Sequence, residues 1–88
     1  MYKLLVVEDE NIIRKGLVHT IDWLSLGFTV IAEGENGSIG LELIKKYEPD
    51  LVITDIKMPE LDGLEMILKA KEAVNFESII LTSYSEFD

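Results

Sequence analysis

The sequence predicts one α/β domain with a parallel sheet covered by helices on both faces, and two observations support this fold class. Short apolar runs without alternation, at residues 4–7, 51–53 and 79–81, are typical of strands buried on both sides. Stretches with apolar residues at helical spacing separate these runs. Strands that alternate with amphipathic helices form right-handed βαβ units and hence a parallel sheet. The 88 residues suit a single domain near the small end of the usual range.

The first strand and helix are expected between residues 3 and 21. The strand covers 3–7, and Asn11 is expected to cap the helix that follows. Three apolar residues recur in this helix at helical spacing, namely Ile13, Leu17 and Ile21. Gly16 weakens a helix by up to about 1 kcal/mol relative to Ala, so we expect a packing reason for it. Trp23 and Leu24 are expected to fold back on the end of the helix.

A second strand is expected at 28–32, with three side chains on one face, namely Phe28, Val30 and Ala32. Asn36 and Gly37 form the strongest turn dipeptide in the chain. Ser38 is expected to cap a second helix, which Pro49 ends. The apolar residues of that helix are Leu41, Leu43, Ile44 and Tyr47.

The third strand covers 51–55, and a loop with Pro59 separates it from a third helix that begins at Asp62 and Gly63. We expect this helix to turn three side chains inward, namely Leu64, Ile67 and Leu68. Its outward side chains are expected to be Lys69, Lys71 and Glu72. A fourth strand is expected at 78–82. The sequence therefore predicts about four strands and three helices.

Composition and charge restrict the possible functions. The net charge of −9, from 17 acidic and 8 basic residues, disfavours direct contact with nucleic acid, whose partners concentrate Lys and Arg. The chain contains no cysteine, which excludes disulfides, thiolate metal sites and cysteine nucleophiles. It contains no apolar stretch of membrane-spanning length and no signal-peptide pattern at its start. These features are compatible with a cytoplasmic location.

Acidic side chains follow the ends of two predicted strands. Glu8 and Asp9 follow the first strand, Asp55 ends the third, and Thr82 ends the fourth. Because the carboxyl ends of parallel strands share one edge of the sheet, these residues should converge there. Clustered carboxylates repel one another unless a proton or cation intervenes, and hard oxygen ligands suit Mg²⁺. The alternative is a group of solvated loop acids in which Asp55 merely begins a turn.

Four segments in this order resemble the receiver domain of two-component response regulators. They are 5–10 (Leu-Val-Val-Glu-Asp-Glu), 49–59 (Pro-Asp-Leu-Val-Ile-Thr-Asp-Ile-Lys-Met-Pro), 62–63 (Asp-Gly) and 79–82 (Ile-Ile-Leu-Thr). The resemblance implies a three-layer, flavodoxin-like, doubly wound sheet with strand order 2-1-3-4. Residues 21–23, 26–28 and 83–87 further resemble the subgroup of regulators with AraC-type DNA-binding output domains.

The resemblance also implies a role for each residue that matches the family motif. Asp55 matches the aspartate that accepts a phosphoryl group from a histidine kinase, a self-modification rather than enzymatic turnover. Asp9, Asp55 and the backbone carbonyl of Lys57 match the ligands of Mg²⁺, and Glu8 matches an acid that acts through metal-bound water. Thr82 matches the hydroxyl residue that hydrogen-bonds the phosphate and reports phosphorylation. DNA binding is expected from an output domain that the chain does not contain.

The sequence departs from the family pattern in two respects. Glu8 stands where Asp is common, and its extra methylene could alter the geometry of the metal site. The second departure is truncation: the chain, taken as a receiver domain over 1–88, ends before the fifth strand and the last two helices. The lysine that pairs with the phosphate in the family is therefore absent. We expect the fourth strand to be a bare edge, Val and Leu side chains of strands one and three to be exposed, and the chain to self-associate.

Two further interpretations remain open. The first is an interaction module, or self-associating fragment, that uses the same scaffold without phosphorylation. The second is an enzyme with metal-dependent phosphoryl chemistry, such as a phosphatase or a topoisomerase-primase-like domain. Lys57 argues against the enzyme because it occupies the position where those families carry a second acid. His19 supplies no general base, since it lies within the first helix rather than at a strand end and is expected to be an exposed or capping residue.

Overall fold

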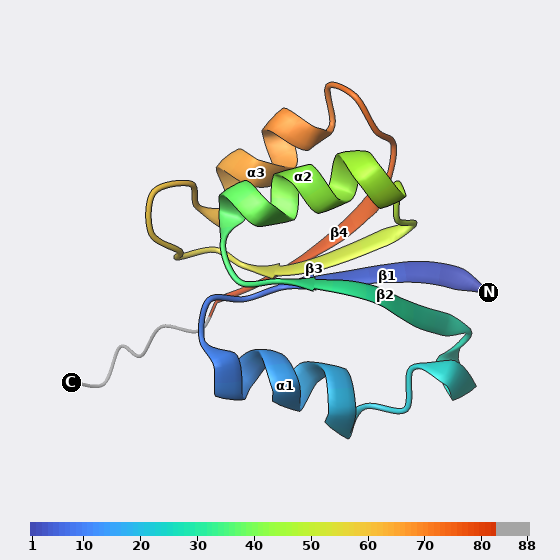
Figure 1. Cartoon of the computed structure of the whole chain (residues 1–88). Coiled ribbons are helices and arrows are strands. Elements are labelled where there is room, and N and C mark those ends of the chain that lie inside the picture. The colour runs from blue at the N-terminus through green and yellow to red at the C-terminus, as the bar shows by residue number, and fades with distance from the viewer. Residues whose placement is uncertain (83–88) are drawn as a thin grey trace.

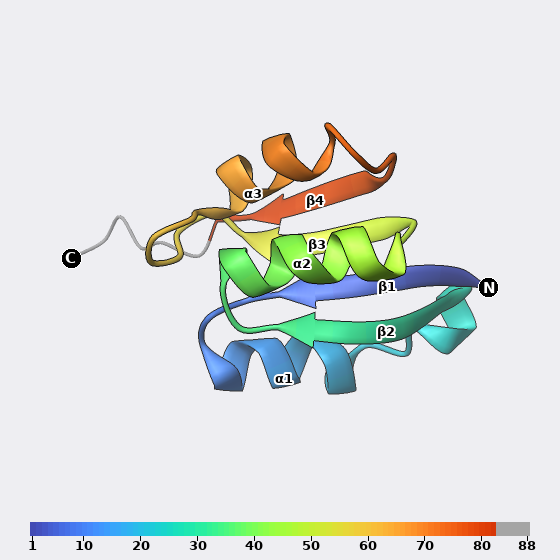
Figure 2. The ribbon, with the colours of Figure 1, turned by 45° about the horizontal axis from the view of Figure 1, so that its top comes forward.

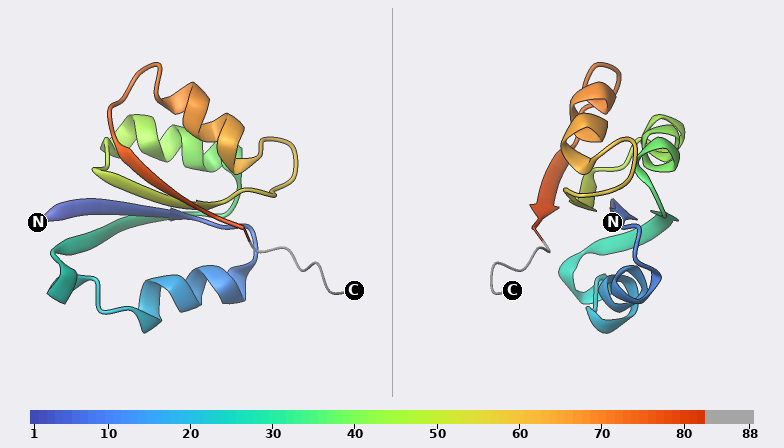
Figure 3. Two further views of the ribbon diagram at one scale, coloured as in Figure 1. Left: turned by 180° about the vertical axis from the view of Figure 1, so that it is seen from behind. Right: turned by 90° about the vertical axis from the view of Figure 1, so that its left-hand side faces the viewer.

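The computed structural model describes residues 1–82 and contains a parallel four-stranded sheet of order β2-β1-β3-β4 (Figure 1). The α/β fold and the strand order predicted from the sequence are confirmed. The strands are β1 (Tyr2–Val7), β2 (Phe28–Gly34), β3 (Leu51–Asp55) and β4 (Glu77–Leu81). The helices are α1 (Asn11–Thr20), α2 (Gly37–Tyr47) and α3 (Gly63–Ala70), with a 3-10 turn at Leu24–Leu26. Helix α1 lies on one face of the sheet, and α2 and α3 lie on the other (Figure 3).

Alternate side chains of the central strands enter two separate cores. The core beneath α2 and α3 includes Leu5, Val7, Ile44, Val52, Met66 and Ile67. The core beneath α1 contains Leu4, Val6 and Ile53, packed against Leu17, Val18 and Trp23. A strand with apolar side chains on both faces lacks alternation in its sequence, which is why the runs of β1 and β3 predicted buried strands.

The expected exposure of Val and Leu side chains on strands one and three is wrong. The Val and Leu residues of β1 and the valine of β3 are all fully buried, because helices cover both faces of these central strands. Exposure occurs instead at the margin of the sheet, where Ile79 of β4 is 47% exposed. Within the described residues β4 pairs with β3 alone, so its outer edge is open, as expected.

A β-bulge makes the predicted face of Ala32 wrong. Leu4 pairs with Val30, whereas the next residue, Leu5, pairs with Ala32, so one residue of β2 is skipped. The skipped residue reverses the alternation of side chains beyond it. Phe28 and Val30 therefore pack in the core beneath α1, and Ala32 packs in the opposite core.

The start of α1 and the turn after it differ from the sequence prediction. Asn11 is the first helical residue, and Glu10 occupies the N-cap position without a side-chain capping bond. A Cβ atom at Gly16 would meet no atom within 4 Å, so the expected packing reason is absent. Trp23 does fold back, and its Nε1 donates a hydrogen bond to the carbonyl oxygen of Leu17 at 2.8 Å. Leu24 does not, since it is 62% exposed.

The other two helices begin with side-chain caps. Asn36, rather than the predicted Ser38, caps α2 by accepting a hydrogen bond from the backbone N–H of Ile39. Asp62 and Glu65 form a reciprocal capping box at the start of α3. The buried positions of α3 are Gly63, Met66, Ile67 and Ala70. Of the three side chains predicted to point inward, Leu64 and Leu68 are instead exposed.

Strand β4 begins and ends one residue earlier than predicted. The segment 83–87, which contributed to the subgroup prediction, lies outside the described residues. Within the described part of the chain, we find no helix with the length and apolar character needed to cross a membrane.

Candidate functional site

Strand register places the predicted acids at one edge of the sheet. Strand β1 runs parallel to β3 with Val7 opposite Thr54, so Glu8 and Asp55 are the next residues on neighbouring strands. Both strands point to the same side of the molecule (Figure 2). Glu8, Asp9 and Asp55 each offer a carboxylate oxygen, and these oxygens all lie within 4.8 Å of one another. The predicted convergence of these acids is confirmed, and we call them the acid cluster.

Asp55 ends β3 in a tightly packed position. Its side chain is 3% exposed, and its Oδ1 accepts a hydrogen bond of 2.7 Å from the backbone N–H of Ile56. The start of α3 lies directly against this residue, because a Cβ atom on Gly63 would be 2.0 Å from the Asp55 carbonyl oxygen. Only glycine allows so close an approach of two backbone segments. The Asp-Gly pair that begins α3 therefore has a structural role beneath the site.

Glu8 is the most deeply buried member of the acid cluster, with 1% of its surface exposed. Burial raises the pKa of Glu8 from 4.5 to about 7, assisted by its hydrogen bond with Asp9 and by the charges of Asp55 and Asp9. The backbone N–H of Glu10 acts in the opposite direction, donating a hydrogen bond of 3.0 Å to Oε2 of Glu8. Full ionisation of the cluster is therefore costly unless a positive charge compensates it.

The donor set of the acid cluster fits a magnesium ion. Mg²⁺ takes hard oxygen ligands and is held by one or two carboxylates together with waters. Three carboxylates with oxygens within 4.8 Å can supply such ligands without rearrangement of the strands. The extra methylene of Glu8 does not remove its carboxylate from this group.

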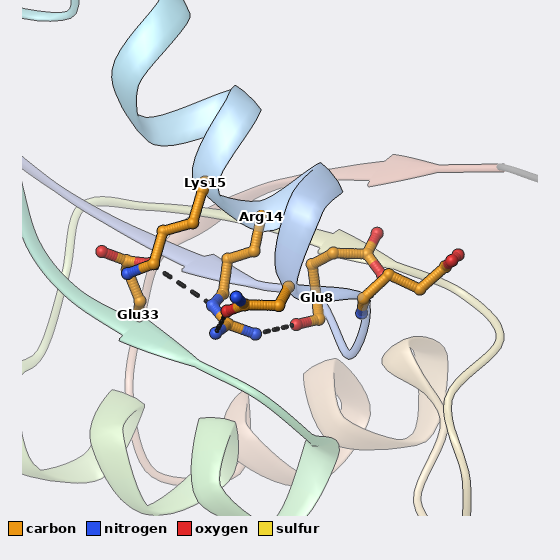
Figure 4. Close-up of polar contacts among 6 residues, drawn as sticks. Glu8, Arg14, Lys15 and Glu33 are labelled. Atoms are coloured by element: carbon orange, nitrogen blue, oxygen red, sulfur yellow. Dashed lines mark hydrogen bonds and ion pairs between the residues drawn. The ribbon is translucent and has the colours of Figure 1, made fainter.

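Arg14, which was not predicted from the sequence, contacts Glu8 of the acid cluster (Figure 4). The side chain is largely buried, and its Nη1 donates a hydrogen bond of 2.7 Å to the backbone carbonyl oxygen of Glu8. Its Nη2 donates to Oδ1 of Asn11, and its Nε lies 3.3 Å from Oε1 of Glu33. The ammonium group of Lys15 lies 3.1 Å from the same oxygen.

A signal for Arg14 exists in the sequence. Arg14 precedes Leu17 and Val18 by three and four residues, which is the spacing of one helix face. Leu17 and Val18 both pack in the core beneath α1. A charged residue on the apolar face of a helix is expected to have fixed partners, because burial of an unpaired charge is costly.

Of the remaining predicted residues, Thr82 and Lys57 follow the carboxyl ends of β4 and β3, whereas His19 lies in α1. Thr82 is exposed and follows Leu81, which pairs with Asp55 and accepts a hydrogen bond of 3.2 Å from the backbone N–H of Ile56. Lys57 is exposed in the loop after β3. His19 is exposed near the end of α1, as predicted.

Comparison with known proteins shows the family. Residues 4–88 match the response regulator receiver domain, and the chain belongs to this family. The receiver domain of AraT, a response regulator from Geobacillus stearothermophilus, superposes with a TM-score of 0.89 at 39% identity, over 98% of this chain and 67% of that one. A two-component transcriptional regulator AraC from Clostridium phytofermentans superposes with a TM-score of 0.88 at 29% identity, again over 98% of this chain and 67% of that one.

Longer relatives are similar over the whole chain. The transcriptional regulatory protein YesN of Bacillus subtilis, described as uncharacterized, is 42% identical over 89 residues, which cover 100% of this chain and 24% of YesN. The transcriptional regulatory protein HptR of Staphylococcus aureus is 39% identical over 88 residues, which cover 100% of this chain and 34% of HptR. The chain thus spans about a quarter to a third of the length of these curated relatives.

Proposed function

We propose that the chain is the phosphoacceptor module of a two-component response regulator, with Asp55 accepting a phosphoryl group from a histidine kinase in the cytoplasm. The observation that supports this most directly is the acid cluster at the carboxyl ends of β1 and β3, in a chain of the receiver family. Relatives that are transcriptional regulatory proteins support transcription as the output. The AraC-named structural relative favours an AraC-type DNA-binding domain as the partner that carries it out.

The acid cluster would hold Mg²⁺. Asp9 and Asp55 would be direct ligands with the backbone carbonyl of Lys57, and Glu8 would act through a bound water. When present, the ion neutralises the negative charge that develops on the transferring phosphoryl group. The carboxylates themselves determine where the ion can sit, because Glu8 and Asp55 are almost completely buried at the ends of rigid strands.

Asp55 would act as the nucleophile. A carboxylate oxygen forms a bond to phosphorus while the bond between phosphorus and the histidine nitrogen breaks, and the departing imidazole keeps the electron pair and takes up a proton. The hydrogen bond from Ile56 N–H to Oδ1 orients the carboxylate during this attack. The Thr82 hydroxyl would then hydrogen-bond the phosphoryl group and report its presence.

Phosphorylation by a small acyl phosphate tests this function directly. We expect the intact mass of the protein to increase by one phosphoryl group after incubation with acetyl phosphate and Mg²⁺, and not when the metal is chelated. Asp55→Asn should abolish the increase, because an amide cannot act as this nucleophile. Glu60→Gln is the matched control, since it removes an exposed acid from the same loop, and it should be phosphorylated normally. Modification of Asp55→Asn to the extent of wild type would contradict the proposal.

A further inference from the structure

The position of the acid cluster depends on how the backbone of Glu8 is held. The backbone N–H of Glu8 donates a hydrogen bond of 3.0 Å to the carbonyl oxygen of Gly34 in β2. The carbonyl oxygen of Glu8 accepts a hydrogen bond of 2.7 Å from Arg14 of α1. These two bonds anchor the Glu8 backbone to β2 and α1 at the point where the chain leaves β1. Since Asp9 follows in the chain, they also determine where its carboxylate can reach.

Arg14 is itself fixed in place. Its guanidinium donates to acceptors on three different segments: the Glu8 carbonyl after β1, the Asn11 side chain in the first turn of α1, and Glu33 in β2. A planar guanidinium has its donors in a rigid fork, so three simultaneous acceptors leave it little freedom. Only 9% of the residue is exposed, and its backbone N–H also bonds the carbonyl of Glu10 at 2.9 Å. An immobilised donor can position the group that it contacts.

We propose that Arg14 is a positioning residue for the divalent cation: through the Glu8 peptide, it holds the carboxylates of Glu8 and Asp9 where they can bind the ion together with Asp55. This role depends on the proposed function, because it needs the acid cluster to be a metal site. The contact is with a backbone carbonyl, so Arg14 acts through geometry. Neutralisation of acidic charge would be a different role, and Lys15 offers a comparison because it pairs with the same Glu33 oxygen without contacting Glu8.

The affinity for Mn²⁺ tests the proposal in the whole protein, with the free ion measured by electron paramagnetic resonance and Mg²⁺ measured by competition. Groups that orient metal ligands typically contribute 10–100-fold to affinity, so we expect Arg14→Met to weaken binding by about tenfold. Arg14→Lys keeps the charge but loses the fork, and should recover only part of the affinity. Lys15→Met removes an exposed charge and should bind within about twofold of wild type.

Three results would overturn the role of Arg14. The first is wild-type Mn²⁺ affinity in a folded Arg14→Met protein. Even if its melting temperature were lower, this result would mean that the Arg14 side chain contributes to stability and not to metal binding. The second is an equal loss of affinity in Lys15→Met; loss of a positive charge should by itself strengthen cation binding, so this result would point to a disturbance around Glu33 rather than to the contact between Arg14 and Glu8. The third is full recovery in Arg14→Lys, which would show that the fork is unnecessary.

Two more variants keep the test decisive. If Arg14→Met does not fold, Asn11→Ala releases one branch of the guanidinium without a change of charge; weaker Mn²⁺ binding would support the proposal and unchanged binding would overturn it. Asp55→Asn separates the two hypotheses. If it binds Mn²⁺ as wild type does, the metal site and the role of Arg14 both fail. If it loses binding while Arg14→Met does not, the role of Arg14 fails alone.

Discussion

Replacement of Glu8 by Gln tests whether the acid cluster carries an electrostatic cost without metal. Glu8 is 1% exposed, and its pKa is raised from 4.5 to about 7, chiefly by burial. The folded protein therefore binds more protons than the unfolded chain between these pH values. The stabilisation associated with protonated Glu8 is fully present below pH 4.5 and is lost as the pH rises through 7. This shift in pKa corresponds to about 3 kcal/mol as an upper value.

Glu8→Gln removes this dependence because its amide is neutral at every pH. In metal-free buffer we expect the variant to be more stable than wild type by roughly 1–3 kcal/mol at pH 8, and this advantage should disappear toward pH 4.5. Urea unfolding at several pH values measures the difference, and comparison with wild type removes the contribution of groups that titrate independently of Glu8. Glu10→Gln is the matched control: Glu10 is two residues from Glu8 and exposed, so its replacement removes one negative charge without removing a buried carboxylate. Its difference from wild type should stay within about 0.5 kcal/mol.

A constant difference in unfolding free energy between Glu8→Gln and wild type from pH 5 to pH 8 would refute this reasoning. It would mean that the Glu8 carboxylate ionises in the folded protein as readily as in the unfolded chain. An equal pH-dependent gain in Glu10→Gln would also count against it, because the effect would then follow net charge rather than burial.

The other predictions concern packing and assembly. Gly63→Ala should lower the free energy of unfolding, measured in urea, by about 1–3 kcal/mol, because the new Cβ would lie 2.0 Å from the Asp55 carbonyl oxygen. Gly16→Ala is the control: a Cβ there meets no atom within 4 Å, so this variant should be as stable as wild type or more stable. We also expect self-association at high protein concentration, since the described part of β4 has an open edge and Ile79 is 47% exposed. Light scattering that shows a monomer at every concentration would contradict the second expectation.

The parallel α/β fold and the convergence of the acids were predictable because they depend on patterns that extend over whole elements, whereas the strand order followed from the resemblance to receiver domains. A buried parallel strand has apolar side chains on both faces, so the runs of β1 and β3 identify it without alternation. Parallel strands then bring their carboxyl ends together whatever the details of packing. Asp55 and the pair of acids after β1 could therefore be placed together from the sequence.

Details that depend on a single residue of register were not predictable. The bulge opposite Leu4 and Leu5 moves Ala32 to the other core, and no glycine or other turn residue at that point of β2 indicates a bulge in the sequence. Gly63 at the start of α3 packs against the Asp55 backbone, and Leu64 and Leu68 point outward although their spacing fits a buried face. In each case a three-dimensional contact decided between two interpretations that the local pattern allowed.

The glutamate at the first acid position also shows how an apparent departure from a family motif can be accommodated. A longer side chain at this position could have carried its carboxylate away from Asp55. In the structure Oε2 of Glu8 turns back to accept the backbone N–H of Glu10, while the carboxylate stays within 4.8 Å of the other two acids. The extra methylene is thus absorbed in a local hydrogen-bonded turn, with the Glu8 peptide held by Arg14 and Gly34.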